Sequence, residues 1–434
     1  MLDLSNYKQL TIELINTGSE LLLGQTLNTH HSWMAQQLAQ HGYRLSHQCT
    51  VNDTGPAIRD ALVTALSRAD LVLTTGGLGP TSDDRTRDDV AELIGSPLHA
   101  SQRVTDHIRD YFEKRGRQMP DRVNVQAMVP EGAEILINAF GTAPGLLIPL
   151  ATNPFRDGNP PAWIAMFPGP PRELHPMFVD QFIPWLLKEL PLEQALVCQI
   201  LRTSGLGESW IEAQLSELLA DLIDKGLDIG YCARSGEVDL RFVAQGSAGE
   251  ALVQQACERT RAELGDLIHS VGSRSLEEAL VEALLDKNLT LAVAESCTGG
   301  FIAHRITNVP GASKVFQAGV VSYANEAKKG FLGVSSQTLE THGAVSEATA
   351  REMAEGILRQ TGADLALSVT GIAGPSGGTA DKPVGTVFLG IADRHGSQVF
   401  KRLNPYDRET FKFVTAHQGM ELLRRKTLGL SLEL

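Results

Sequence analysis

Three apolar runs in the carboxy-terminal third end in polar residues of kinds that catalytic sites use. The runs are 291–294, 315–322 and 365–369, and the residues that follow them are Ser296, then Tyr323 with Lys328, then Thr370. Because Thr298-Gly299-Gly300 opens a helical stretch, Ser296 is expected on a tight strand-to-helix turn. Unpaired N–H groups at a helix start can stabilise an oxyanion or bind an anionic group. Alternatively, the small residues only let the strand turn closely into the helix.

A second cluster lies in the first third, where the apolar run 70–75 leads into G-G-L-G-P-T-S-D-D, residues 76–84. A strand, a glycine-rich loop and a helix start form a phosphate cradle, because exposed backbone N–H groups close on an anion. Asp83 and Asp84 would repel that anion unless a divalent cation such as Mg²⁺ bridged them. The alternative is that the acids favour the helix N-terminus electrostatically and the glycines form a turn.

The elements that must position this second cluster alternate between strand and helix patterns. Strands are expected at 10–15 and 70–75, and helices at 32–40, 57–67 and 88–94. This alternation predicts an α/β domain with a doubly wound parallel sheet and a ligand at the carboxyl ends of its strands. Two further tight loops, 140–148 and 167–171, are expected to line the same crevice.

The pattern changes near residues 184–191, and we expect three domains: 1–185, a small α+β connecting module at 186–270, and a carboxy-terminal α/β domain at 271–434. In the middle module, Cys232 and Cys257 lack suitably spaced partners and are expected to pack in the interior. In the last domain, Ser346 is the expected N-cap of a helix over 346–361, and Gly362 follows its end.

Composition sets limits on the partners of this 434-residue chain. The net charge of −13, with no basic block to offset it, argues against direct nucleic-acid binding. The five cysteines show no C-x-x-C spacing, which suits a reducing compartment. The first ten residues lack the pattern of a secretory signal, and no apolar run is long enough for a membrane span. We therefore expect a cytoplasmic protein with no membrane partner.

With these residues in hand, the chain resembles the CinA family along nearly its whole length. Residues 17–24 (TGSELLLG) and 76–86 (GGLGPTSDDRT) are similar to the molybdopterin-binding fold of molybdenum-cofactor proteins. Residues 294–300 (AESCTGG), 321–328 (VSYANEAK) and 368–375 (SVTGIAGP) resemble nicotinamide mononucleotide amidohydrolases of the PncC type. The resemblance implies hydrolysis of the carboxamide of nicotinamide mononucleotide, which gives nicotinic acid mononucleotide and ammonia.

The resemblance also implies roles for the polar residues of the last domain. Ser296 is the implied nucleophile, and Lys328 becomes the candidate base because no nearby histidine supplies a triad. Tyr323 would orient Lys328 or relay a proton, and Thr370 would contact the oxyanion or hold Ser296 in place. Adjacent Cys297 is the rival nucleophile on chemical grounds, with a packing role as its alternative.

Substrate contacts are expected from the glycines of two loops and from one arginine. These residues are Gly299, Gly300, Gly371, Gly374 and Arg408. Arg408 is the candidate for the substrate phosphate, and the alternative is a solvated surface arginine. No cofactor is expected for the amidase.

For the first domain, the resemblance implies an ADP-ribose pyrophosphatase that needs a divalent cation, Mg²⁺ or a transition metal such as Co²⁺. The implied metal ligands are Asp83, Asp84 and Glu20, and the implied phosphate loop comprises Gly76, Gly77, Gly79 and Thr81. The alternatives are that this domain is a non-enzymatic module for pterin or nucleotide binding or for assembly, or that the whole chain is a competence-related protein-interaction partner. We expect small-molecule nucleotide substrates and a homodimer.

Overall fold

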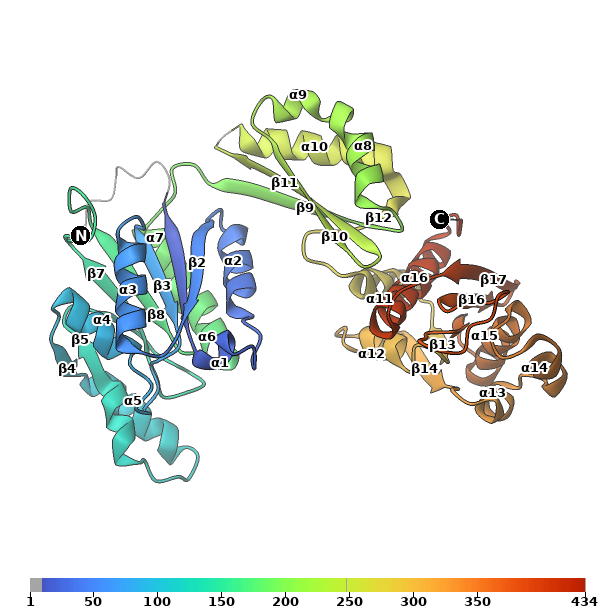
Figure 1. Cartoon of the computed structure of the whole chain (residues 1–434), viewed down its shortest axis with the longest axis horizontal. Helices are drawn as coiled ribbons and strands as arrows, with labels where there is room; N and C mark the ends of the chain where they lie inside the picture. The colour runs from blue at the N-terminus through green and yellow to red at the C-terminus, as the bar shows by residue number, and fades with distance from the viewer. Residues whose placement is uncertain (1–9, 247, 434) are drawn as a thin grey trace. The chain divides into compact units, whose positions relative to one another are not determined.

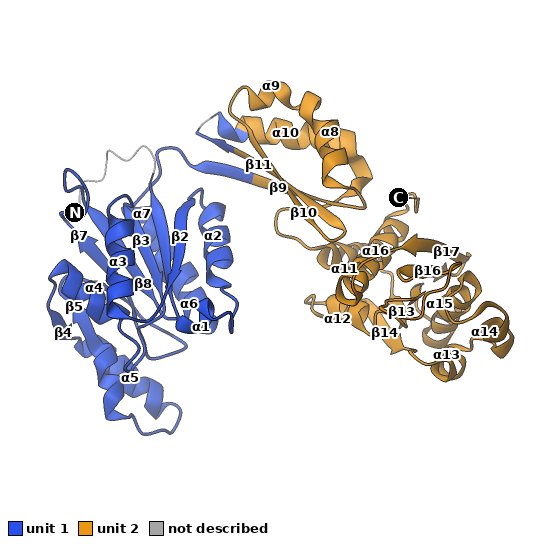
Figure 2. Cartoon of the chain, in the orientation of Figure 1, with its two compact units in different colours: residues 1–198, 244–250 blue, residues 199–243, 251–434 orange. Residues whose placement is uncertain are grey.

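The computed structural model describes residues 10–246 and 248–433. Residues 1–9, which hold most of the segment searched for a targeting signal, lie outside the described residues. The chain forms two compact units, one within residues 1–198 and 244–250, the other within 199–243 and 251–434 (Figures 1 and 2).

The first unit is built on a six-stranded sheet in the order β2-β1-β3-β8-β7-β6. Its strands are β1 (Ile12–Thr17), β2 (Leu45–Val51), β3 (Leu71–Thr75), β6 (Glu134–Leu136), β7 (Gly145–Leu150) and β8 (Ala162–Phe167). The strands β1, β2, β3 and β8 run parallel, whereas β7 and β6 extend the sheet antiparallel. A separate antiparallel pair comprises β4 (Leu98–Ala100) and β5 (Met128–Pro130). The expected parallel sheet is thus present over four strands, and the expected loop at 140–148 runs into β7.

Helices cover both faces of this sheet, as a doubly wound fold requires (Figure 1). They are α1 (Ser19–Leu22), α2 (His30–Gln40), α3 (Gly55–Leu66), α4 (Thr86–Ile94), α5 (Gln102–Glu113), η1 (Asp121–Ala127), α6 (Pro171–Met177), η2 (Phe178–Phe182) and α7 (Ile183–Glu189). Leu14 packs in one core with Met34 of α2, whereas its neighbour Ile15 packs in the other with Ile58 of α3. Successive strand residues point to opposite faces, so a strand buried on both faces reads as one apolar run.

The middle module has a four-stranded sheet in the order β10-β11-β9-β12 with helices packed against it. Its elements are β9 (Leu196–Ser204), α8 (Glu208–Leu218), α9 (Ala220–Ile223), β10 (Asp228–Arg234), β11 (Glu237–Gln245), α10 (Gly249–Leu264), η3 (Gly265–Leu267) and β12 (Ile268–Val271). The sequence patterns missed β10, whose side chains are half-buried or exposed, and the short strand β12, in which only His269 and Ser270 are buried. Cys257 is buried as expected, but Cys232 lies on β10 and is exposed, so its predicted packing role was wrong.

The carboxy-terminal sheet has five strands in the order β14-β13-β15-β16-β17. The strands are β13 (Leu291–Glu295), β14 (Phe316–Val321), β15 (Leu365–Gly371), β16 (Thr386–Asp393) and β17 (Gly396–Leu403). The helices are α11 (Leu276–Lys287), α12 (Phe301–Thr307), η4 (Ala312–Lys314), α13 (Asn325–Leu332), α14 (Ser336–His342), α15 (Glu347–Thr361) and α16 (Arg408–Leu428). The core on one face draws on α11, α12 and α16, and the core on the other draws on α13 and α15.

Capping residues set the helix ends of this domain where the sequence predicts them. The Ser346 side chain accepts a hydrogen bond from the Thr349 N–H, and Gly362 ends α15 in the left-handed region at φ 68°. Asp407 caps α16 by accepting from the N–H groups of Glu409 and Thr410. The predicted start of α15 is therefore confirmed to within one residue.

A buried polar contact joins the middle module to α16. The Ser204 hydroxyl lies 2.9 Å from Nε2 of His417, and a carboxylate oxygen of Glu237 lies 3.4 Å from its Nδ1. Burial lowers the pKa of His417 to about 3, so the imidazole is neutral and its contact with Glu237 is not an ion pair. Because α16 begins at Arg408, this contact fixes the helix that carries one of the candidate substrate residues.

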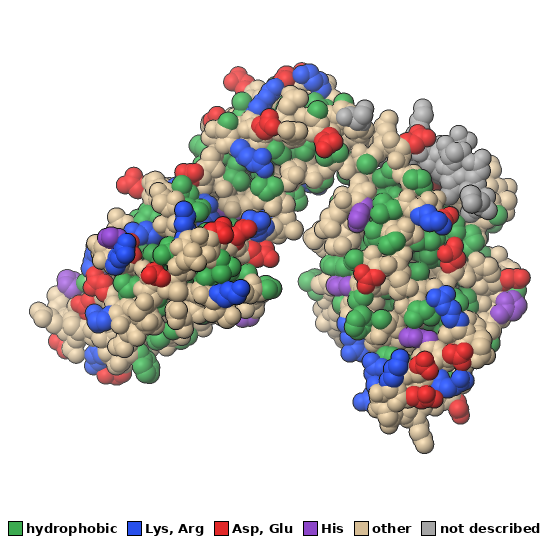
Figure 3. Space-filling view, turned by 180° about the vertical axis from the view of Figure 1, so that it is seen from behind, with side chains coloured by type: hydrophobic (Ala, Val, Ile, Leu, Met, Phe, Trp, Pro, Cys, Tyr) green, Lys and Arg blue, Asp and Glu red, His purple; other side chains and the backbone are tan. Residues whose placement is uncertain are grey.

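The surface carries interspersed charges. On the face in Figure 3, both Lys and Arg side chains and Asp and Glu side chains are spread over the surface. Among the described residues, no helix has the length and apolar character needed to cross a membrane.

Candidate active site

Ser296 follows β13, the strand that lies between two parallel neighbours, β14 and β15. The carboxyl ends of these strands therefore open at one edge of the sheet. The Ser296 N–H donates to the Val369 carbonyl at 2.9 Å, which ties the turn to β15. Gly299 and Gly300 follow with φ of 64° and 92°, in the left-handed region where a side chain is disfavoured. These glycines let the chain turn directly from β13 into α12.

Lys328 is the side chain that reaches Ser296. Its Nζ lies 3.0 Å from the Ser296 Oγ, 2.8 Å from the Ser322 carbonyl oxygen and 3.3 Å from the Tyr323 carbonyl oxygen. Only 1% of Lys328 and 8% of Ser296 is exposed. The structure thus brings together the residues predicted as nucleophile and base, one on the turn after β13 and the other on α13, the helix that follows β14.

The surroundings of Lys328 favour its neutral form. Burial lowers the pKa of Lys328 below its ordinary value of 10.5, because the ammonium loses its hydration, and the nearby Cys297 thiol opposes this only in part. Among the described residues, no carboxylate raises the pKa of Lys328 appreciably. A neutral amine has two hydrogens for the two carbonyls and a lone pair for the Ser296 hydroxyl. In that form the contacts match those of a general base, whereas an ammonium would donate to all three oxygens.

Glu295 occupies the helix start that was expected to bind an anion. Its carboxylate accepts the N–H groups of Gly300 at 3.0 Å, Ile302 at 3.1 Å and Ala303 at 2.9 Å. Glu295 is 1% exposed. The expectation that these N–H groups serve an oxyanion was therefore wrong, because the chain's own carboxylate already caps α12. The sequence signal for this cap is an acid shortly before the glycines that open the helix.

Two other backbone groups of the turn, the N–H groups of Cys297 and Thr298, interact with the Cys297 thiol and partly offset the rise of its pKa. The N–H groups of Cys297 and Thr298 donate to no carbonyl among the described residues, whereas the Gly299 N–H donates to the Ser296 carbonyl at 3.1 Å. Both belong to the residues directly after Ser296. Donors of this kind, next to a nucleophile, can stabilise the charge on a tetrahedral intermediate.

Arg408 and Tyr323 meet at the mouth of the site. The Arg408 guanidinium donates to the Tyr323 hydroxyl at 2.8 Å and to the Gly374 carbonyl at 3.0 Å. Tyr323 is 60% exposed, and it contacts Lys328 through its backbone carbonyl. In this arrangement the Tyr323 hydroxyl is directed to Arg408, so the orienting contact to Lys328 comes from the main chain.

Thr370 and the glycines after β15 take structural contacts. The Thr370 hydroxyl donates to the Ala344 carbonyl at 2.7 Å, and no hydrogen bond between Thr370 and Ser296 is present in the described residues. A Cβ on Gly371 would stand 2.8 Å from the Thr386 carbonyl oxygen, and one on Gly374 would stand 2.6 Å from a methyl group of Val384. These glycines therefore allow the loop after β15 to lie against the residues that precede and begin β16.

Cys297 is buried in the core of the domain, although its thiol is near enough to Lys328 to affect the pKa of that amine. It belongs to the apolar core with Val293 and Ile302, and burial raises the pKa of its thiol to about 12. A thiol with so high a pKa supplies almost no thiolate near neutral pH. The predicted packing role is confirmed.

The first unit has a cavity of about 410 Å³ beside the ends of β1 and β3. Its lining includes the predicted Glu20, Gly76, Gly77, Gly79, Asp83 and Asp84, together with Asp53, Gln126 and Glu173, which the sequence patterns missed. Thr81 does not line it, but its N–H donates to the Asp84 carboxylate at 2.9 Å. Gly76 and Gly77 have φ of 93° and 69°, and a Cβ on Gly77 would overlap the Thr86 side chain. The loop shape therefore depends on glycine.

The carboxylates that line this cavity do not form a complete set of ligands for a metal ion. Among the described residues, no three His, Cys, Asp or Glu side chains come together as metal ligands. The Asp84 carboxylate also accepts the Thr81 hydroxyl, and the Glu20 carboxylate lies against Gly18. As the residues stand, they do not fit a divalent ion, and the metal site stays a prediction.

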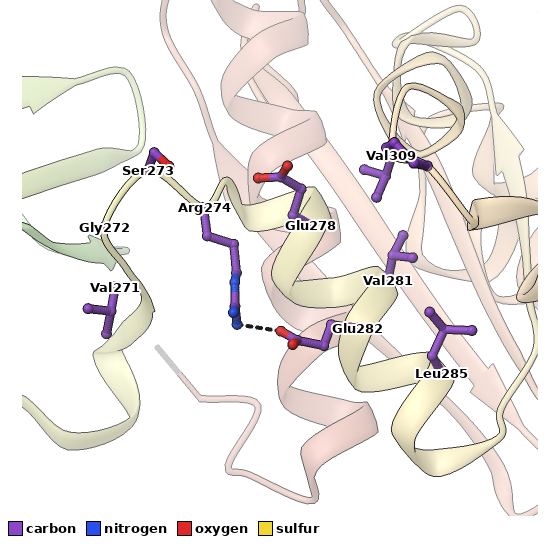
Figure 4. A pocket seen from close by; sticks show the side chains of 10 residues that line it. Val271, Gly272, Ser273, Arg274, Glu278, Val281, Glu282, Leu285 and Val309 are labelled. Carbon is purple, nitrogen blue, oxygen red and sulfur yellow. Dashed lines mark hydrogen bonds and ion pairs between the residues drawn. The ribbon is translucent and has the colours of Figure 1, made fainter. Parts of the chain in front are cut away.

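A larger hollow of about 550 Å³ follows β12 (Figure 4). Arg274 and Glu282 form an ion pair in it, beside Val281 and Leu285. It holds no paired nucleophile and base. We therefore place the candidate active site at Ser296 and Lys328, since buried hydrogen bonding between reactive groups is a stronger indication of catalysis than volume.

Comparison with known families matches three models to consecutive parts of the chain. Residues 273–427 match the model described as "CinA C-terminal domain", and residues 13–188 match "Probable molybdopterin binding domain". Residues 199–270 match "Damage-inducible protein CinA KH domain". Because KH folds include binders of single-stranded RNA, the expected lack of nucleic-acid binding stays a prediction.

Relatives cover nearly the whole chain. A CinA-like protein of Akkermansia muciniphila is 43% identical over 95% of this chain and 96% of its own length. A protein of Caldicellulosiruptor saccharolyticus, 42% identical over 96% of this chain and 99% of its own length, is named as competence-damage inducible. Among solved structures, the competence/damage inducible protein CihA of Agrobacterium tumefaciens is 42% identical, covering 34% of this chain and 91% of its own, with a TM-score of 0.33.

Proposed function

The chain belongs to the CinA family, and from that premise we propose that its carboxy-terminal domain hydrolyses the carboxamide of nicotinamide mononucleotide. The products are nicotinic acid mononucleotide and ammonia. The observation that carries this proposal is the 3.0 Å contact between the Lys328 amine and the Ser296 hydroxyl in a buried site. Family membership supplies the substrate class, and the serine–lysine pair supplies a means of amide hydrolysis.

The first half of the reaction forms an ester with the enzyme. Neutral Lys328 takes the proton of the Ser296 hydroxyl as Oγ attacks the carboxamide carbon. The negative charge on the carboxamide oxygen is stabilised by the N–H groups of Cys297 and Thr298. When the tetrahedral intermediate collapses, the C–N bond breaks and the protonated Lys328 gives its proton to the leaving amide nitrogen, which departs as ammonia.

The second half returns the enzyme to its starting state. Water gives a proton to neutral Lys328 as its oxygen attacks the ester carbon. Collapse of this second intermediate breaks the bond to the Ser296 Oγ, which recovers its proton from Lys328. The product is the carboxylic acid, and neither half requires an oxidant, a reductant or a second substrate besides water.

Ammonia release by the purified full-length chain tests the proposal. With nicotinamide mononucleotide, we expect one ammonia for each nicotinic acid mononucleotide formed, and no release by the Ser296→Ala variant. Absence of release by the wild-type chain, or equal release by the variant, would overturn the proposal.

The cavity of the first unit suggests a second function, and here we propose the binding of a nucleotide or a pterin. Its support is the 410 Å³ cavity lined by the glycine loop and by polar side chains at the ends of parallel strands. The family resemblance favours ADP-ribose as a ligand and its metal-dependent cleavage as an activity. Because the described carboxylates do not gather as metal ligands, we derive no metal-dependent step.

Two measurements on the full-length chain separate binding from cleavage. Calorimetry with ADP-ribose is expected to show one site for each chain, and a lack of binding would contradict the proposal. Release of AMP from ADP-ribose with added Mg²⁺ or Co²⁺ would show that the carboxylates rearrange to bind a metal, and the pyrophosphatase would then replace the binding function.

A further inference from the structure

Lys412 lies over the turn that carries Ser296. It is on α16, four residues after Arg408, and residues four apart share one face of a helix. Its Nζ lies 3.9 Å from where a Cβ on Gly299 would stand, and 6.0 Å from the centre of the Phe301 ring. The ammonium is therefore next to Gly299 and Phe301, three and five residues after the nucleophile.

Lys412 and Arg408 lack carboxylate partners among the described residues. The polar contacts of the Arg408 guanidinium are the Gly374 carbonyl and the Tyr323 hydroxyl. Two acids flank Arg408 in sequence: Asp407, whose carboxylate accepts the N–H groups of Glu409 and Thr410, and Glu409, for which no ion pair with either cation is present in the described residues. In a chain with a net charge of −13, two cations without carboxylates on one helix face indicate a place for an anionic ligand.

We propose that Lys412 binds the phosphate of the substrate together with Arg408 and so selects the nucleotide over the nucleoside. This inference rests on the proposed amidase function. Arg408 stands beside the loop after β15, and Lys412 stands beside the turn after β13, so the two cations flank the edge of the sheet where Ser296 lies. A phosphate held between them leaves the other end of the substrate free to place its carboxamide at Ser296.

The physical effect expected of Lys412 is a difference between two ligands. The phosphate of nicotinamide mononucleotide gains a charge-assisted contact with the ammonium, whereas the nucleoside without phosphate has no group to make it. A purely structural role, in which the lysine only covers the Phe301 ring, would affect both ligands alike. The ratio of the two affinities therefore separates selection of phosphate from packing.

The test is calorimetric binding of both ligands to the full-length chain in the Ser296→Ala background, which removes turnover. Adding Lys412→Gln is expected to reduce the affinity ratio of nucleotide to nucleoside about tenfold or more, the size expected for loss of a hydrogen bond to a charged group. Lys412→Arg, which keeps the charge, is expected to retain most of the ratio. Added inorganic phosphate should compete with the nucleotide less strongly in Lys412→Gln.

Lys401→Gln is the matched control, because the Lys401 Nζ also lies 6.0 Å from a phenylalanine ring, that of Phe388, but on the exposed strand β17. It is expected to leave the ratio within twofold. An unchanged ratio in Lys412→Gln, or an equal loss in Lys401→Gln, would overturn the inference. The amidase proposal is judged separately by ammonia release from the wild-type chain. If the chain selects the nucleotide but releases no ammonia, the amidase proposal is contradicted and the role of Lys412 in phosphate binding is supported.

Discussion

The turn after β13 and the loop after β3 start from the same local pattern: a buried strand, glycines in the left-handed region, and the start of a helix. In the carboxy-terminal domain, the Glu295 carboxylate accepts the N–H groups at the start of the helix. Lys328, on the helix that follows the neighbouring strand, contacts the Ser296 hydroxyl. In the first unit, the corresponding loop borders a cavity with several carboxylates.

The difference shows that a strand–turn–helix pattern is a scaffold whose chemistry is set by what its neighbours supply. The carboxy-terminal turn receives a buried lysine whose pKa is lowered, and so its serine has a base. The loop of the first unit lies beside acidic side chains and an open cavity. This arrangement suits binding of a polar ligand more than covalent catalysis. The predictions below test this contrast, from the largest expected effect to the smallest.

Removing the nucleophile should give the largest effect. Ser296→Ala is expected to reduce ammonia release by about three orders of magnitude or more, since the covalent step is lost. Cys297→Ala should retain most turnover, because that thiol is buried with a pKa of about 12. Steady-state assays of both variants measure these rates. Near-normal turnover by Ser296→Ala would show that Ser296 is not the nucleophile.

Lys328→Arg should be nearly as damaging as Lys328→Ala, with a loss of about two to four orders of magnitude for a general base. Arginine keeps the charge but does not deprotonate in the working range. In the wild type, the rate should rise with pH as the ammonium loses its proton, with an inflection below 10.5 because burial lowers the pKa of Lys328. Substantial turnover by Lys328→Arg would show that the base is elsewhere.

Glu295→Gln should reduce kcat about tenfold to a hundredfold. The hydrogen bonds to a charged carboxylate are replaced by weaker bonds to a neutral amide oxygen, and the NH2 group of the glutamine side chain would face backbone N–H groups to which it cannot bond. The Ser296 turn loses its anchor on α12, so kcat is expected to fall more than KM rises. Glu347→Gln, an exposed acid in the first turn of α15, is the control. Equal effects of the two substitutions would mean that Glu295 serves only general helix stability.

Gly77→Ala should damage the first unit and spare the amidase. The added Cβ would clash with the Thr86 side chain. In addition, Gly77 has a φ of 69°, and this left-handed backbone conformation costs about 1–2 kcal/mol for a residue with a side chain. We expect ADP-ribose binding to be lost and ammonia release to stay within twofold of the wild type. Calorimetry and the ammonia assay on one preparation measure both, and a parallel loss would show that the two sites are not independent.

A chelator should have the smallest effect on the amidase. The groups around Ser296 are an amine, hydroxyls and backbone N–H groups, and the nucleophile is the protein's own hydroxyl. EDTA is therefore expected to change ammonia release by less than twofold. Chelator-sensitive release, restored by added Mg²⁺ or Co²⁺, would show that the amidase site shares the metal dependence predicted for the first unit.

The sequence alone determined the local elements around the site. The apolar run of β13, the glycines at 299 and 300, and the caps Ser346 and Gly362 are local signals, because backbone conformation and capping depend on a few consecutive residues. Parallel strands also imply that residues at their carboxyl ends share one edge. For this reason the sequence could predict that Ser296 and Lys328 lie near each other.

Only the tertiary structure decided which partner each group takes. The Tyr323 hydroxyl turns to Arg408, and the carboxylate of Glu295 takes the N–H groups assigned to an oxyanion. Those choices depend on side-chain directions and distances among elements far apart in sequence, which residue type does not encode. The lowered pKa of Lys328 likewise arises from burial by the assembled domain, so the serine–lysine pair becomes reactive only when the chain is folded.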